Sequence, residues 1–129
     1  MPLARIDLSK DASAERVRVV SEAVYNAMVE VANVPLNDKF QIITRHAADE
    51  IVYPADGYLG INYSRDIILI QVTWVGGRST EVKKQFYRRI ADEIHEKQQV
   101  RREDIWISLV DSGREDWSFG NGEMQYAPT

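Results

Sequence analysis

Cysteine is absent from this chain of 129 residues, and histidine occurs only as His46 and His95. Without cysteine the chain has no disulfide, no thiolate nucleophile and no cysteine-bound zinc. The two histidines do not form the His-Glu-x-x-His spacing that binds zinc in metalloproteases. We therefore expect no metal site, and nothing in the sequence indicates a cofactor.

An excess of one charge and long apolar runs are missing as well. The 16 Lys and Arg residues oppose 20 Asp and Glu residues, and the net charge of −4 offers no general attraction to nucleic acid or to an anionic membrane. No apolar run approaches the length of about 18 residues that a bilayer requires, and no charged-then-apolar leader opens the chain. The sequence predicts a cytoplasmic protein with one domain, residues 1–129.

Proline is rare, and one of the four prolines is Pro2. Removal of Met1, which a small following residue favours, would give Pro2 a free secondary amine. Because α-amino groups titrate at about 7.7–8.0, such an amine can take or give a proton near neutral pH. The alternative is that Pro2 only opens an edge strand, where its missing N–H does little harm.

The first third of the chain predicts a β-α-β unit. Residues Leu3–Leu8 are strand-like, an amphipathic helix of about 20 residues follows Ser13 as its N-cap, and residues Lys39–Thr44 form a second strand. A right-handed crossover of this kind joins parallel strands, which begin at the same edge of a sheet. We therefore expect Asp38 to lie beside Pro2.

The second half repeats this pattern after a long connection over residues 45–66. A strongly apolar strand at Ile67–Trp74, a helix capped by Ser79 and a strand at Asp104–Val110 follow the first unit at a constant offset. This offset pairs Ser13 with Ser79, Val20 with Phe86, Val24 with Ile90, Met28 with Ile94, Val34 with Val100, Asp38 with Asp104, and Phe40 with Trp106. We predict an α+β fold with two repeats, at about 2–44 and 67–110, and a C-terminal segment at 111–129.

Two such units commonly combine about a pseudo-twofold axis, with their first strands antiparallel and adjacent and both helices on one face. The end of the third strand then lies where the first strand begins. Arg78, just beyond that end in the Gly76-Gly77-Arg78 turn, is predicted to face Pro2. The repeat pairs Pro2 with Ile68, which has no amine, so the second half is expected to be a non-catalytic copy.

These features together resemble the tautomerase superfamily, and within it malonate semialdehyde decarboxylase most closely. The resemblance rests on the N-terminal proline, the β-α-β repeat, Asp38, Arg78 and the run Asp116-Trp117-Ser118-Phe119-Gly120. It implies a homotrimer with the fold of macrophage migration inhibitory factor. It also implies that Pro2 is the acid or base, Asp38 its carboxylate neighbour and Arg78 the substrate clamp, with Trp117 and Phe119 as an apolar wall.

The chain departs from the decarboxylase pattern at one place. That pattern has two arginines flanking a proline after the third strand, whereas this chain has Gly76-Gly77-Arg78 and so only the second arginine. Arg5, Arg114 or an arginine of a neighbouring subunit are the candidates for the missing charge.

Three function classes follow from these residues. In the first, a cationic Pro2 supports decarboxylation or hydration of a small 3-oxo acid whose carboxylate binds Arg78. In the second, a neutral Pro2 is the base of a keto–enol tautomerase acting on an aryl pyruvate or another 2-oxo acid. In the third, the trimer only binds ligands, and Asp38 is structural like its repeat partner Asp104. Because a nearby carboxylate raises the pKa of an amine, Asp38 favours the first class.

Overall fold

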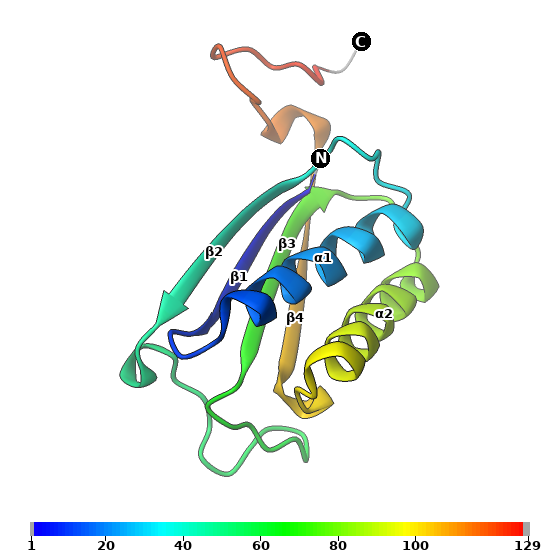
Figure 1. The fold of residues 1–129 in the computed structure, drawn as a ribbon. Helices are drawn as coiled ribbons and strands as arrows, with labels where there is room; N and C mark the ends of the chain where they lie inside the picture. The colour runs from blue at the N-terminus through cyan, green and yellow to red at the C-terminus, as the bar shows by residue number, and fades with distance from the viewer. Residues whose placement is uncertain (1, 128–129) are drawn as a thin grey trace.

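The computed structural model describes residues 2–127, which form a four-stranded sheet covered on one face by two helices (Figure 1). Met1, whose removal the sequence leads us to expect, lies outside the described residues. In chain order the elements are β1 (Leu3–Ser9), α1 (Ala14–Glu30), β2 (Phe40–His46), η1 (Ala48–Glu50), β3 (Ile68–Val75), α2 (Thr80–Gln98), η2 (Arg102–Asp104), β4 (Ile105–Ser112) and η3 (Arg114–Asp116).

The strand order is β2-β1-β3-β4, and the pairing follows the predicted pseudo-twofold arrangement. β1 is parallel to β2, β3 is parallel to β4, and β1 pairs antiparallel with β3, with Leu3 opposite Thr73 and Ile6 opposite Ile70. Both crossover helices lie on the same face of this sheet (Figure 1). The α+β fold of two β-α-β repeats is therefore confirmed.

The helices begin at matching positions of the two repeats, Ala14 and Thr80, and α2 runs two residues further than α1. The Ser13 hydroxyl accepts from the Arg16 N–H at 3.0 Å, and the Ser79 hydroxyl accepts from the Val82 N–H at 3.2 Å, so both predicted N-caps are present. Just beyond the helix ends, Asn33 and Gln99 both adopt left-handed backbone angles, with φ of 58° and 55°. This conformation stops a right-handed helix and turns the chain toward the next strand.

The core lies between the helices and the sheet. All the paired apolar residues predicted for the helix faces are buried, and alternating residues of β1 and β3 meet them. Trp74 packs against Phe86 with ring centroids 5.1 Å apart. The opposite face of the sheet has no covering layer among the described residues, and it exposes four large apolar side chains: Phe40, Ile42, Trp106 and Val110.

Strand boundaries differ slightly from the expectations: β2, β3 and β4 each begin one residue later than predicted, and all four strands end one or two residues later. β4 begins at Ile105, because Asp104 is buried in η2 and its carboxylate receives hydrogen bonds from an earlier loop. The long connection contains η1 and one antiparallel bridge between Tyr58 and Ile61. Its exposed apolar side chains gave the sequence no clear period.

Candidate functional site

Pro2 and Asp38 meet at the edge of the sheet where β1 and β2 begin. Leu3 pairs with Phe40 in the parallel ladder, which places Pro2 beside the residues that precede β2. Pro2 is buried and Asp38 is half-buried. Both line a cavity of about 10 Å³, large enough for about one water molecule. Its other lining residues are Tyr25, Met28, Lys39, Phe40 and Gln41.

A larger cavity adjoins this one and shares two of its lining residues, Asp38 and Phe40. It has a volume of about 280 Å³ and is also lined by Pro35, Asn37, Phe119 and Tyr126. Pro35 and Asn37 precede β2, whereas Phe119 and Tyr126 come from the C-terminal segment. Asp38 therefore lies between a small cavity at Pro2 and a space that can hold a molecule of a few heavy atoms.

Arg78 is held in a fixed orientation at the end of β3. Its Nε donates to the Ala32 carbonyl at 3.2 Å, and its Nη1 donates to the Val75 carbonyl at 2.9 Å. The guanidinium lies over the Trp74 ring, 4.2 Å from the centroid. These contacts leave Nη2 without a hydrogen-bond acceptor among residues 2–127. An arginine fixed in this way is suited to bind a carboxylate without losing side-chain entropy.

The charge on Arg78 is set by two opposing effects. Burial lowers the pKa of the Arg78 guanidinium, and the negative charge of Asp111 on β4 opposes that shift. Asp111 in turn accepts from the Trp74 indole N–H at 2.9 Å and from Lys83 at 3.1 Å. The hydrogen bond from Lys83, followed by the one from Trp74, holds the pKa of Asp111 below its usual value.

Gly76 lies against this same carboxylate. A Cβ at position 76 would lie 3.2 Å from the Asp111 Cβ and 3.3 Å from its Oδ2, so a side chain there would require Asp111 to shift by a few tenths of an ångström. Gly77 follows with φ of +122°, a conformation that side-chain-bearing residues rarely adopt. The backbone of this turn thus favours glycine at position 77, and Asp111 crowds position 76.

The C-terminal segment forms a short stack of aromatic rings. Trp117 and Phe119 are stacked with centroids 5.7 Å apart, and Tyr126 meets Phe119 edge-on at 5.1 Å. The Trp117 indole donates to Ser112 Oγ at 2.9 Å, which ties the stack to the end of β4. Phe119 lines the larger cavity, whereas Trp117 supports it from behind.

The other predicted cations are in different surroundings. Arg5 is exposed in the middle of β1, on the open face of the sheet. The Arg114 guanidinium lies over the Tyr126 ring at 4.8 Å, next to a residue of the larger cavity. Sequence reasoning missed Tyr25, Lys39 and Tyr126. Parallel pairing predicted Asp38 beside Pro2, and the observed register, with Leu3 opposite Phe40, places Lys39 there as well.

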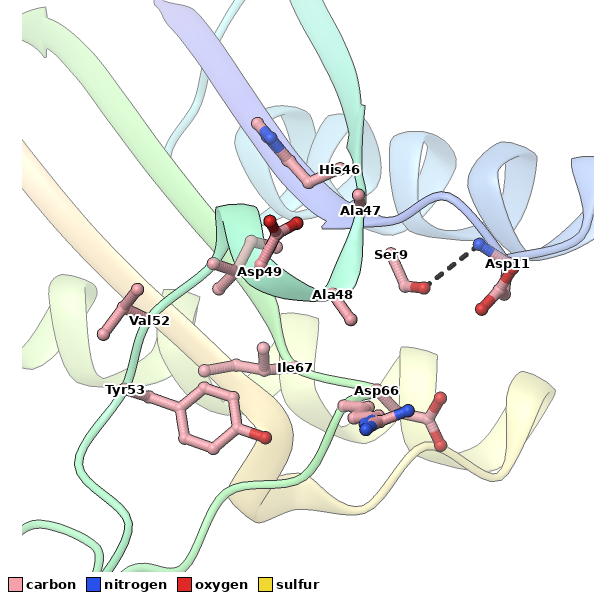
Figure 2. A pocket seen from close by; sticks show the side chains of 12 residues that line it. Ser9, Asp11, His46, Ala47, Ala48, Asp49, Val52, Tyr53, Asp66 and Ile67 are labelled. Carbon is pink, nitrogen blue, oxygen red and sulfur yellow. Dashed lines mark hydrogen bonds between the residues drawn. The ribbon is translucent and has the colours of Figure 1, made fainter.

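Another large cavity lies at the opposite end of the sheet, where β1 and β2 end (Figure 2). Its volume is about 570 Å³. The residues that line it are Ser9, Asp11, His46, Ala47, Ala48, Asp49, Ile51, Val52, Tyr53, Arg65, Asp66 and Ile67. His46 is anchored there by a contact of 2.6 Å between its Nε2 and Asp7 Oδ1. The length of β1 separates this cavity from Pro2.

Metal binding and membrane insertion can be considered from the side chains and the helices. Among residues 2–127 there is no group of three or more His, Asp or Glu side chains arranged to hold a metal ion. In the same part of the chain, no helix combines the length and the apolar character needed to cross a membrane.

Sequence comparison shows which family of proteins this chain resembles. The sequence profile of a family described as "Tautomerase enzyme" matches residues 38–120. The chain is 38% identical over 125 residues to "Probable tautomerase YusQ" of Bacillus subtilis (strain 168), covering 97% of this chain and 98% of that protein. It is 31% identical over 126 residues to "Probable tautomerase YrdN" of the same organism, covering 98% and 96%.

Solved structures agree with these sequence relatives. A malonate semialdehyde decarboxylase inhibited by 3-bromopropiolate superposes with a TM-score of 0.87 at 36% identity, covering 96% of this chain and 93% of that one. A second malonate semialdehyde decarboxylase, described with decarboxylase and hydratase activities, has a TM-score of 0.85 at 29% identity and coverages of 96% and 95%. With its two β-α-β repeats and these relatives along nearly its whole length, the chain belongs to the tautomerase family.

Proposed function

We propose that the protein is a cofactor-independent enzyme that decarboxylates, or hydrates, a small 3-oxo acid such as malonate semialdehyde. The observation that carries the proposal is the position of Asp38, which lines both the cavity at Pro2 and the adjoining cavity of about 280 Å³. The likeness to two malonate semialdehyde decarboxylases supports the same substrate class. Pro2, Asp38 and Arg78 are the proposed catalytic residues, and Arg78, Trp117 and Phe119 the proposed substrate-binding residues.

In the proposed reaction the substrate carboxylate binds the unoccupied edge of the Arg78 guanidinium. The Pro2 amine, kept protonated by Asp38, donates a hydrogen bond to the 3-oxo oxygen. The bond between C1 and C2 breaks and carbon dioxide leaves. The electron pair of the broken bond stays on the rest of the substrate and forms an enolate, which the Pro2 cation stabilises. Pro2 then gives its proton to C2 to form acetaldehyde, and the neutral amine regains a proton from water.

Keto–enol tautomerisation of an aryl pyruvate or another 2-oxo acid is the second candidate. It is favoured by the two Bacillus subtilis relatives, both described as probable tautomerases. In that reaction neutral Pro2 is the base that moves a proton between the carbon atom and the carbonyl oxygen. The aromatic stack of Phe119 and Tyr126 would then pack against the aryl ring. A non-catalytic binding role remains the third candidate.

Direct assay separates the three candidates. Protein whose loss of Met1 is verified by intact mass is incubated with malonate semialdehyde and, separately, with the enol form of phenylpyruvate. The proposal predicts that acetaldehyde, observed by proton NMR, and carbon dioxide form at a rate above that of Arg78→Ala. Faster conversion of the enol with no decarboxylation supports the tautomerase. Absence of both reactions contradicts catalysis and leaves the binding role.

We also propose that the protein assembles as a homotrimer. The uncovered face of the sheet exposes the apolar side chains of Phe40, Ile42, Trp106 and Val110, which a second subunit would bury. Fused 4-OT proteins that share the fold, at 19% identity, are described as symmetric trimers. Sedimentation at micromolar concentration should give three times the mass of one chain, and a monomer would contradict the proposal.

A further inference from the structure

Lys39 is the residue that the parallel register places directly beside Pro2. Leu3 pairs with Phe40, so the preceding residues of the two strands also lie next to each other. Two residues further along, Ala4 is fully buried under the helices and Gln41 accepts from Ser21 of α1. Because side chains alternate along a strand, Pro2 and Lys39 point toward the same helix-covered face.

The Lys39 side chain is held at this position by α1. Its Nζ lies 4.7 Å from the centroid of the Tyr25 ring, and the Tyr25 hydroxyl is fixed by donating to the Leu36 carbonyl. Tyr25 and Lys39 both line the cavity of about 10 Å³ that Pro2 and Asp38 share. The amine of Pro2 therefore has a carboxylate and an ammonium group on the same small cavity.

The second repeat contains no such cation. At the offset that pairs Ser13 with Ser79, Lys39 corresponds to Ile105, which packs against the core, and Pro2 corresponds to the buried Ile68. Phe40 and its counterpart Trp106 are both large, exposed aromatics, so this part of the repeat is otherwise similar. A lysine thus occurs in the repeat that begins with proline and is replaced by an apolar residue in the one that does not.

The charges around the amine act in opposite directions. Asp38 favours the protonated amine, and with Asp38 alone the proton would be held tightly and given up slowly. A proton donor works best when its pKa lies near the working pH. The other charged or titratable groups around these cavities include Tyr25 of α1, Tyr126 with Arg114 over its ring, and Arg78 after β3, whose charge is countered by Asp111.

We propose that Lys39 lowers the proton affinity of the Pro2 amine and so offsets Asp38, which makes Pro2 a proton donor that can also release its proton. The proposal rests on the proposed role of Pro2. Lys39 acts by changing the proton affinity of the Pro2 amine. It also adds a positive charge near Pro2, in a chain that has glycine instead of arginine at position 76.

The test measures the amine directly, without substrate. Potassium cyanate carbamylates unprotonated amines, so the rate of carbamylation of the Pro2 peptide, followed by mass spectrometry between pH 6 and 11, gives the midpoint of its titration. Four proteins with Met1 removed are compared: the unaltered chain, Lys39→Met, Lys39→Arg and Lys10→Met. Lys10→Met is the control, because it has the same net charge as Lys39→Met. Lys10 is exposed beyond the far end of β1 and so lies away from Pro2.

Lys39→Met should move the midpoint to higher pH by about 0.5 or more, because a nearby positive charge is removed. Lys39→Arg and Lys10→Met should leave it in place. An unchanged midpoint in Lys39→Met, or an equal shift in Lys10→Met, overturns the proposal. The pH profile of kcat on the oxo acid should shift in the same direction. If the protein has no oxo-acid activity, the proposed function fails while the cyanate result still decides the role of Lys39.

Discussion

The two β-α-β repeats share their serine N-caps and their parallel strand pairing, but the aspartates at the start of their second strands have different surroundings. Asp38 in the first repeat is half-buried and lines two cavities. Asp104 in the second repeat is 1% exposed and lines none of the cavities described above. Its carboxylate accepts from the Ser64 N–H at 2.7 Å, from the Ser64 hydroxyl at 2.6 Å and from Arg101 at 3.1 Å.

In the second repeat, the long connection supplies the partners of the aspartate. β3 is preceded by this connection, and Ser64 of the connection donates two hydrogen bonds to the Asp104 carboxylate. In the first repeat, Pro2 lines the small cavity together with Asp38. An aspartate at the same position of the repeat thus stabilises the fold in the second repeat and, as we propose, takes part in catalysis in the first.

The largest expected effect comes from blocking the amine that only the first repeat possesses. Protein in which Met1 is retained, for example through a large residue substituted at position 2, should lose the general acid–base contribution, roughly 10²–10⁴-fold in kcat. Intact mass establishes the state of the terminus, and product formation gives the rate. A protein that keeps Met1 and is still fully active would show that the repeats do not differ in this respect.

Removal of the structural aspartate should affect stability and leave chemistry intact. Asp104→Ala leaves the Ser64 N–H and hydroxyl without their acceptor, and we expect a loss of about 2 kcal/mol in the free energy of unfolding. Urea denaturation measures this loss, and the rate per folded molecule should be unchanged. A small loss of stability accompanied by a large loss of activity would assign Asp104 to the site.

The stability difference between Asp104 and its neutral variant Asp104→Asn should depend on pH. Burial favours the neutral acid, but hydrogen bonds from Arg101 and Ser64 and the charge on Arg101 outweigh it and lower the pKa of Asp104. A carboxyl with a depressed folded-state pKa stabilises the fold above its unfolded value of about 3.9, and this contribution is lost as pH falls through the folded pKa. Unfolding curves from pH 7 to pH 2 should therefore converge at the acid end.

Arg78→Ala should weaken every reaction at the first repeat, by roughly 30-fold in kcat/KM, because the charge-assisted contact with the substrate carboxylate is lost. Lys83→Met is the matched control, since it removes a cation that also contacts Asp111 but lies outside the proposed contact with substrate. Kinetics on decarboxylation and on tautomerisation give both values. Equal effects of the two substitutions would mean that Arg78 acts only through Asp111.

Asp38→Asn should give the smallest effect, about tenfold on decarboxylation, and the most selective one. Loss of the carboxylate lowers the proton affinity of the Pro2 amine, so a reaction that needs the cation slows while tautomerisation by the neutral amine is unchanged or faster. Parallel assays of both reactions on one preparation measure the ratio. An equal loss in both would make Asp38 structural, like Asp104.

Much of the fold was predictable because its signals are local. The caps Ser13 and Ser79, the alternating strands and the constant offset between the halves predicted two β-α-β units, and the structure confirms them. The placement of Asp38 at the edge where Pro2 begins the sheet also followed from parallel pairing alone. The roles of these residues in catalysis stay predictions. The starts of β2, β3 and β4 were each predicted one residue early. At β4 the reason is that Asp104 is buried against Ser64 of the long connection, which is far from it in the sequence.

The sequence by itself determined the elements, their order and the residues that face the core, since periodicity and capping act within one turn or strand. Tertiary structure decided what surrounds each charged group. It fixed Arg78 on Trp74, brought Lys39 onto Tyr25, set Asp111 close against Gly76, and placed Phe119 and Tyr126 against the segment containing Asp38. These contacts join residues far apart in the chain, and their geometry depends on how helices and strands pack, which no local pattern specifies.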